Sequence, residues 1–315
     1  MNGTKKFWVP IAGLFAAIVV IGVALFPQAK GSSSAPEQFE IANGTPYCLK
    51  DGTLYRYENG GWSEVERPEQ IRQLVSCDLA LCTVDKNGTV FYDGELPDPM
   101  EIRSLGSAAA FDMAHQLMEL NSSTSLVGLS GDIVHWPSAL AEDGTIFLPA
   151  PALSYYERYT MKERPIELSD EFVLTEQGNV YSLAVKEFTA EPVLRCIYDG
   201  GDITSISAAY GTRQCLGLKE DGTVLFWNES GIKNFDIPSV EEWTNVRSVK
   251  QGFHFAVGLT GKGEVLYADN SEGNTEKIGG QLKAWGKIEA IAIYGMTVFG
   301  LKPDGSCVSM EVDLV

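Results

Sequence analysis

The chain has 315 residues, 44% of them apolar, and a formal net charge of −18. This length and composition exclude a disordered or fibrous protein and allow a large buried core. The strong negative charge opposes binding to nucleic acid and to anionic lipid headgroups, so we expect no nucleic-acid partner.

An uncharged apolar segment lies close to the N-terminus. Residues 7–26 contain no charged side chain and have about the length that crosses the hydrocarbon core of a bilayer. Lys5 and Lys6 precede the segment, and the first acidic residue is Glu37. The positive-inside tendency therefore places residues 1–6 in the cytoplasm and the rest of the chain outside.

The sequence thus predicts one transmembrane helix over 7–26, a flexible stalk over 27–38 and an extracytoplasmic domain over 39–315, all held at the cell membrane as a single-pass protein. Two alternatives stay open. The apolar segment could be a cleaved signal peptide, or a helix buried in a core.

A strand–turn–strand unit recurs through the extracytoplasmic domain. In its clearest copy Leu216 and Leu218 alternate with smaller or polar residues, Asp221 and Gly222 turn the chain, and Val224 begins the return strand. Asp-Gly between apolar runs indicates a hairpin, because glycine adopts the positive φ of the turn without steric cost. The corresponding glycines of the seven copies are Gly52, Gly88, Gly144, Gly178, Gly222, Gly263 and Gly305.

A period of about 40 residues with strand–turn–strand units is typical of propeller blades. Each small sheet cannot bury both of its faces alone, whereas stacking the units around an axis does so. We therefore predict an all-β fold, a seven-bladed β-propeller over 39–315 that follows the single transmembrane helix.

A second pattern, aliphatic-x-x-aliphatic followed by small residues, precedes most hairpins and predicts a strand crowded near the central axis. Phe39–Ala42 and Ile166–Leu168 are weaker versions. The third copy has extra residues, about 108–131, and we expect them to include a short helix with its apolar residues on one face. The clear copies begin at Ile71, Ile102, Ile203, Val246 and Ile288.

The repeats resemble regulator-of-chromosome-condensation repeats, which build seven-bladed β-propellers. The copy around Gly222 carries the resemblance best, with Ile203, Ile206, Ala208, Ala209, Gly211, Gly217, Leu218, Asp221, Gly222, Val224 and Trp227 at the positions of the family motif. The next copy matches at Val246, Val249, Gly252, Leu259 and Gly263, and the last at Ile288, Ile291, Leu301, Asp304 and Gly305.

The resemblance covers residues 39–315, and the short repeats are similar to those of compact bacterial, secreted members of the family. It implies the fold. The nuclear roles of the family need a nuclear or cytosolic location, which the predicted anchor contradicts, so no catalytic residue is carried over. Trp227 alone stands at the family's tryptophan position.

Residues that carry chemistry are sparse in this sequence. His115, His135 and His254 are scattered and lack metal-ligand spacing, and no nucleophile or phosphate-loop motif occurs. We expect no catalytic residue, no metal and no cofactor. Six cysteines permit disulfides without fixing their pairing. Cys48 in the first repeat and Cys307 in the last would be neighbours in a closed ring, so they are the candidate disulfide pair. Alternatively, both are buried unpaired cysteines that act as small apolar core residues.

The leading functional prediction is a membrane-anchored, extracytoplasmic propeller that binds a protein partner without enzymatic activity. The negative charge favours a basic partner. The predicted contact residues are Phe111 and His115 in the insert and the tyrosines Tyr155, Tyr156 and Tyr159, since loops and large aromatics dominate interfaces. These aromatics could instead cover the end of a blade. Recognition of carbohydrate or cell wall is the alternative function, and an enzyme with its site in the central channel is a third.

Overall fold

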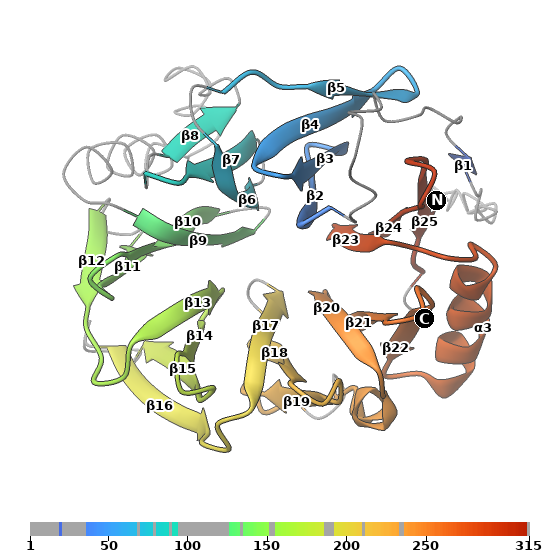
Figure 1. The fold of residues 1–315 in the computed structure, drawn as a ribbon. Coiled ribbons are helices and arrows are strands. Elements are labelled where there is room, and N and C mark those ends of the chain that lie inside the picture. The colour runs from blue at the N-terminus through green and yellow to red at the C-terminus, as the bar shows by residue number, and fades with distance from the viewer. Residues whose placement is uncertain are drawn as a thin grey trace, which may run out of the picture.

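The computed structural model describes residues 19–20, 36–67, 70–77, 80–87, 90–93, 126–132, 135–150, 155–185, 192–209, 212–232 and 236–313. Within these residues the strands form seven antiparallel sheets set side by side in a ring (Figure 1). Each sheet consists of strands that follow one another in the sequence, apart from the short β1. The all-β, propeller-like fold predicted from the repeats is confirmed.

We number the sheets one to seven in chain order and call the first strand of each its inner strand, because these strands surround the centre of the ring (Figure 1). The first sheet contains β2 (Gln38–Ala42), β3 (Thr45–Lys50), β4 (Thr53–Glu58) and β5 (Gly61–Glu64). The second contains β6 (Ile71–Cys77), β7 (Ala80–Asp85) and β8 (Val90–Asp93), and the third β9 (Leu126–Asp132), β10 (His135–Ala141), β11 (Ile146–Ala150) and β12 (Tyr155–Tyr159).

The fourth sheet contains β13 (Pro165–Ser169), β14 (Phe172–Thr175), β15 (Val180–Val185) and β16 (Pro192–Tyr198). The fifth contains β17 (Ile203–Ala209), β18 (Gln214–Lys219) and β19 (Val224–Asn228), and the sixth β20 (Val246–Gly252), β21 (Phe255–Thr260) and β22 (Val265–Asp269). The seventh contains β23 (Ala290–Tyr294), β24 (Thr297–Leu301) and β25 (Cys307–Glu311).

The predicted turn glycines adopt the conformation that the hairpins require. The six of them that the structure describes all have positive φ, for example +80° at Gly222 and +86° at Gly263. The carbonyl of the turn glycine then accepts a hydrogen bond from the first aliphatic residue of the next repeat. Ile71 N donates to Gly52 O at 2.9 Å, and the same bond joins Ile203 to Gly178, Val246 to Gly222 and Ile288 to Gly263.

The ring closes because β2 of the first sheet lies beside β23 of the seventh (Figure 1). At this junction the carbonyl of the turn glycine, Gly305, is bound by a side chain and not by the main chain. Trp62 Nε1 donates a hydrogen bond to Gly305 O at 2.8 Å. Phe39, Ile41 and Cys48 of the first sheet pack against Leu301 and Cys307 of the seventh. The apolar core therefore lies between neighbouring sheets, as expected of stacked blades.

Three inner strands differ from the predicted positions of the motif. In the first sheet Phe39 holds the place of the second aliphatic residue, as Ile291 does in the seventh, and not of the first. In the third sheet the inner strand is β9, where Leu126 and Leu129 repeat the aliphatic spacing, so it overlaps the expected insert of 108–131. In the fourth sheet Pro165 and Leu168 are buried, whereas Ile166 is 50% exposed. The motif there begins one residue earlier than predicted, at a proline that has no N–H to donate.

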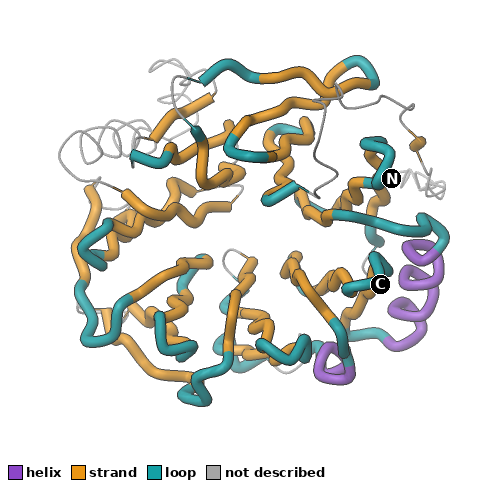
Figure 2. Tube along the Cα trace, in the orientation of Figure 1, coloured by secondary structure: helices purple, strands orange, loops and turns teal. Residues whose placement is uncertain are grey.

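Helices cover the outer edges of the fifth and sixth sheets. Figure 2 shows the helical residues together at one side of the rim. The 3₁₀ helix η2 (Pro238–Glu242) follows β19, and α3 (Glu272–Lys283) follows and packs against β22. Ser271 caps α3, and Ile278, Leu282 and Trp285 join the apolar cluster of the last two sheets. These segments occupy the place of a fourth strand.

The predicted membrane-spanning segment, 7–26, lies largely outside the described residues. Its two described residues form β1 (Val19–Val20), which pairs with the outer edge of β25 and so differs from the helix expected there. Among the residues that the structure describes, we find no helix with the length and apolar character needed to span a membrane.

Candidate functional site in the central channel

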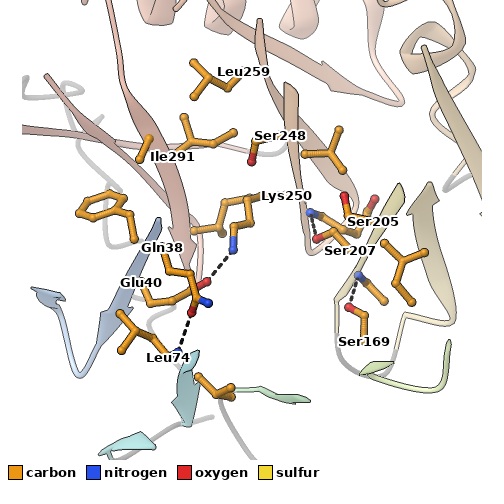
Figure 3. A pocket seen from close by; sticks show the side chains of 18 of the residues that line it. Gln38, Glu40, Leu74, Ser169, Ser205, Ser207, Ser248, Lys250, Leu259 and Ile291 are labelled. Carbon is orange, nitrogen blue, oxygen red and sulfur yellow. Dashed lines mark hydrogen bonds and ion pairs between the residues drawn. The ribbon is translucent and has the colours of Figure 1, made fainter. Parts of the chain in front are cut away.

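The inner strands surround a cavity of about 1150 Å³ in the centre of the ring, which we call the central channel. Figure 3 shows its lining side chains projecting from several strands toward the same space. In the second, fifth, sixth and seventh sheets the aliphatic pair of the motif, such as Ile203 and Ile206, is buried. The residues next to that pair, such as Ser205 and Ser207, line the channel instead.

Small hydroxyl side chains form the wall of the channel over the fourth, fifth and sixth sheets: Ser169, Ser205, Ser207 and Ser248 (Figure 3). Two of them also join neighbouring inner strands. Ser169 Oγ accepts a hydrogen bond from Ala208 N at 2.8 Å, and Ser207 Oγ accepts one from Gln251 N at 2.9 Å. Each hydroxyl keeps its own proton as a donor.

A side-chain amide makes the same kind of link between the first two sheets. Gln38 Oε1 accepts from Leu74 N at 2.6 Å, while Gln38 Nε2 donates to Arg72 O at 3.0 Å. Polar side chains thus join the inner strands of the first and second, the fourth and fifth, and the fifth and sixth sheets.

Charged residues from three sheets meet inside the channel. Lys250 Nζ on β20 lies 2.6 Å from Glu40 Oε1 on β2, so the ion pair reaches past the seventh sheet (Figure 3). Ala292, which follows the second aliphatic residue of that sheet's motif, is small and fully buried. Glu167 on β13 also lines the channel, and burial raises the pKa of its carboxyl to about 7, although the Ile206 backbone and Lys250 act to lower it.

Gln251 is a buried amide in the same lining, with 6% of its surface exposed. Its Nε2 donates to Gly252 O at 3.1 Å and to Gln214 Oε1 at 3.4 Å. Its Oε1 is buried and has no hydrogen-bond partner among the residues that the structure describes. A buried acceptor left unpaired costs about 1–3 kcal/mol, so a donor that reached this oxygen would recover that cost.

The two ends of the channel differ in chemistry. At the end where the inner strands begin, the lining includes Arg72, Ile166 and Arg247. Arg247 Nε donates to Thr260 O at 3.3 Å, and its Nη2 donates to Glu289 O. We call this the entry end.

At the other end the inner strands turn back, and we call it the turn end. Phe253, in the turn of the sixth sheet, is 53% exposed, and its ring centroid lies 4.1 Å from that of His254. Burial lowers the pKa of His254. Tyr294 and Met296 are half-buried beside the corresponding turn of the seventh sheet and line the same cavity. Aromatic and apolar side chains therefore gather at the turn end.

No protein-family model matches the sequence, and a search of curated proteins finds no match. Solved structures do match. Yeast RCC1 (Prp20), in its crystal structure bound to Kap60, gives a TM-score of 0.54 at 15% identity over 88% of this chain and 80% of that chain. The Prp20p structure from Saccharomyces cerevisiae gives 0.54 at 13% identity over 94% and 90%. The chain folds as an RCC1-like β-propeller.

The CRINKLY WD40 ectodomain of the Arabidopsis thaliana receptor kinase ACR4 is another similar propeller, with a TM-score of 0.52 at 13% identity over 88% of this chain and 96% of that chain. At such identities the likeness establishes the fold alone. The function of this propeller has to be argued from its own residues.

The predicted contact residues lie away from the channel or outside the described residues. Phe111 and His115 are among the latter. Tyr155, Tyr156 and Tyr159 all belong to β12, the outer strand of the third sheet, with Tyr155 opposite Ala150 and Tyr156 opposite Pro149. Tyr159 is partly buried and packs against the cluster of Leu140, Ile146 and Leu168. Tyr159 therefore covers part of the apolar core of this blade.

Cys48 and Cys307 lie in one cluster at the junction of the first and seventh sheets. Both are buried free thiols. Burial raises the pKa of each to about 12, and the proximity of Cys307 contributes at Cys48. The structure brings the two cysteines together as predicted from ring closure, and their disulfide stays a prediction.

The charged group in the channel is absent from the predicted site residues. Lys250 follows the second aliphatic residue of its motif, and Glu40 follows Phe39, which holds that place in β2 although it was predicted to begin the motif. Serine or alanine stands at this position in four of the seven sheets, so comparing the repeats would have found Glu40 and Lys250. Glu167 precedes the second aliphatic residue of its motif, where Ser205, Ser248 and Ala290 stand in three other sheets.

Proposed function

We propose that the protein is a membrane-anchored, extracytoplasmic propeller that binds a protein partner and has no enzymatic activity. The observation that carries the proposal is the turn end of the channel. There Phe253 exposes half of its surface on a ring with polar links between inner strands, beside His254 and the half-buried Tyr294 and Met296. Exposed aromatics on a rigid scaffold are typical of protein-binding surfaces. The proposal includes a seven-bladed ring, with each of the seven described sheets forming one blade.

The location follows from the apolar segment 7–26 with Lys5 and Lys6 before it. The described chain enters the ring at Pro36, which lines the channel together with Arg72 at the entry end. An anchor leading into that end leaves the turn end facing away from the membrane, where a partner has access to it.

The partner is expected to be basic, because the chain beyond Lys5 and Lys6 carries a net charge of about −20. Similar propellers support binding to proteins: RCC1 was crystallised with Kap60, and the Prp20p structure is described with binding to Gsp1p and histones. The roles of these proteins are not transferred to this chain.

Capture experiments with matched variants test the proposal. The full-length protein, solubilised from its own membranes after cross-linking, should retain a protein partner. Phe253→Ser should lose it, whereas Ile232→Ser should keep it, since Ile232 is 50% exposed but belongs to the rim after β19. Equal capture by both variants, or none by the wild type, would contradict protein binding at the turn end.

The location has a separate test. Protease treatment of intact cells should degrade residues 39–315 and spare the N-terminus. Complete protection of 39–315 would overturn the extracytoplasmic orientation.

Carbohydrate recognition is the second candidate, and the serine-lined wall favours it. Ser169, Ser205, Ser207 and Ser248 offer several hydroxyls on one face, and Phe253 offers a ring for stacking. A glycan array run beside the capture experiment separates the two functions. Binding of sugars without capture of any protein would reverse our order of preference.

A further inference from the structure

The charges inside the central channel are unequal. Glu40 and Glu167 both lie near the ammonium of Lys250, which contacts Glu40 at 2.6 Å. Glu167 receives a hydrogen bond from the Ile206 backbone and only the longer-range attraction of Lys250. Lys250 thus serves two carboxylates in a partly enclosed space, where charge is costly unless it is paired. The other cations of the lining, Arg72 and Arg247, lie at the entry end.

A second acceptor lies closer to the turn end. Gln251 is two residues before Phe253, and within the described part of the chain its buried Oε1 has no partner. When the repeats are aligned on their second aliphatic residue, Glu167 and Gln251 are three positions apart along the strand direction. At the usual rise per strand residue, the component of their separation along the strands is roughly 10 Å.

We propose that the channel receives an arginine residue from a loop of the protein partner, entering from the turn end. Its guanidinium pairs with the Glu167 carboxylate, and a backbone N–H of the same loop donates to Gln251 Oε1. This inference rests on the proposed function and names the chemistry by which the partner is recognised.

Arginine fits this lining better than other groups. Its planar guanidinium presents five N–H donors and stays charged, so it can bind a carboxylate through two hydrogen bonds and still reach a serine hydroxyl. Phe253 and His254 at the mouth offer aromatic faces on which the loop can pack.

The test uses N-acetyl-L-arginine methylamide as the probe, because it carries the guanidinium and two amide N–H groups. Binding to the full-length protein in detergent is measured by calorimetry or by saturation-transfer NMR. The neutral citrulline analogue, which keeps the shape but not the charge, should bind at least tenfold more weakly.

Variants assign the two contacts. Glu167→Gln should weaken binding of the arginine probe about ten- to hundredfold, as expected for loss of a charge-assisted hydrogen bond. Gln251→Leu should weaken both probes by a similar factor. Glu220→Gln, at an exposed turn of the fifth sheet, is the control and should change nothing. Thermal unfolding of each variant verifies that the ring is intact.

Equal affinity for the arginine and citrulline probes, no binding of either, or full binding by Glu167→Gln would overturn the inference. Its failure is distinguishable from failure of the proposed function. If the wild type captures a partner and Glu167→Gln captures it equally well, protein binding stands and the arginine contact is wrong.

Discussion

Glu167 shows how a single buried carboxyl in the channel affects the whole protein. Its pKa rises from an ordinary value of 4.5 to about 7, chiefly through burial. Between these values the folded state binds more protons than the unfolded state, so the free energy of unfolding falls as the pH rises. We predict that ionisation of Glu167 lowers the free energy of unfolding by on the order of 1–3 kcal/mol between pH 4.5 and pH 8.

Denaturant unfolding of Glu167→Gln across this pH range tests the prediction. Relative to wild type, the variant should gain stability as the pH rises, because glutamine has no charge to bury. Glu220→Gln should follow the wild-type curve throughout. Parallel curves for wild type and Glu167→Gln would contradict the buried, proton-binding state of this residue.

The turn glycines allow a second prediction at the scale of single residues. A side chain at Gly263 would meet Ile288 O at 2.8 Å, in addition to the strain of a φ of +86°. Gly231 has a φ of +72° but open space around it. We expect Gly263→Ala to lower the free energy of unfolding by about 2–4 kcal/mol and Gly231→Ala by about 1 kcal/mol, as measured by urea unfolding. Equal losses of unfolding free energy in the two variants would show that backbone strain alone, without the contact to Ile288 O, determines the effect.

At the scale of the element, a tryptophan side chain joins the first sheet to the turn of the seventh. Trp62→Phe removes the hydrogen bond from Nε1 to Gly305 O and leaves that carbonyl without this donor. Trp285→Phe is the matched control, because Trp285 is also buried and its Nε1 has no partner among the described residues.

We predict that Trp62→Phe costs about 1–2 kcal/mol more than Trp285→Phe in the free energy of unfolding. Thermal or urea unfolding measures the difference. Similar costs for the two variants would mean that ring closure depends on packing at Trp62 and not on its hydrogen bond.

The hairpins were predictable from sequence because their turns depend on local chemistry. A glycine at positive φ between apolar runs leaves few other structures, as Gly222 and Gly305 illustrate. The fourth repeat was misplaced by one residue because Pro165 replaces an aliphatic residue, and in the third repeat the motif at Ile102 was preferred to the one at Leu126.

Helix α3 could not be predicted in the same way. Residues 272–283 contain three glycines, which weaken helix propensity, and the helix is held by Ser271 at its N-cap and by packing of Ile278 and Leu282 on the sixth sheet. The channel site depends on residues brought together from the first, fourth and sixth sheets. Only ring closure places Glu40 near Lys250, which are 210 residues apart.

At the scale of the whole molecule, the junction between the first and seventh sheets decides whether the ring is covalently closed. Cys48 and Cys307 share one cluster there. We predict that they form a disulfide when the protein is exported to an oxidising compartment, contributing about 4–5 kcal/mol by restricting the unfolded chain.

Peptide mapping by mass spectrometry, with and without reduction, detects the bond in protein isolated under thiol-blocking conditions. The Cys48→Ser, Cys307→Ser double variant should have the stability of the reduced wild type. Alkylation of both thiols in unreduced, unfolded protein would contradict the pairing.

The carbonyls of Gly52, Gly178, Gly222 and Gly263 are bound by the main chain of the following repeat, but Gly305 is bound by an indole that belongs to the start of the chain. A main-chain link persists through most substitutions, whereas a side-chain link is lost when the side chain changes rotamer. Amide hydrogen exchange should therefore be faster at this junction than at the four junctions with a main-chain link. A partner that contacts the first and seventh sheets together would hold this junction closed. Its binding would therefore raise the melting temperature of the whole ring, including sheets that it does not contact.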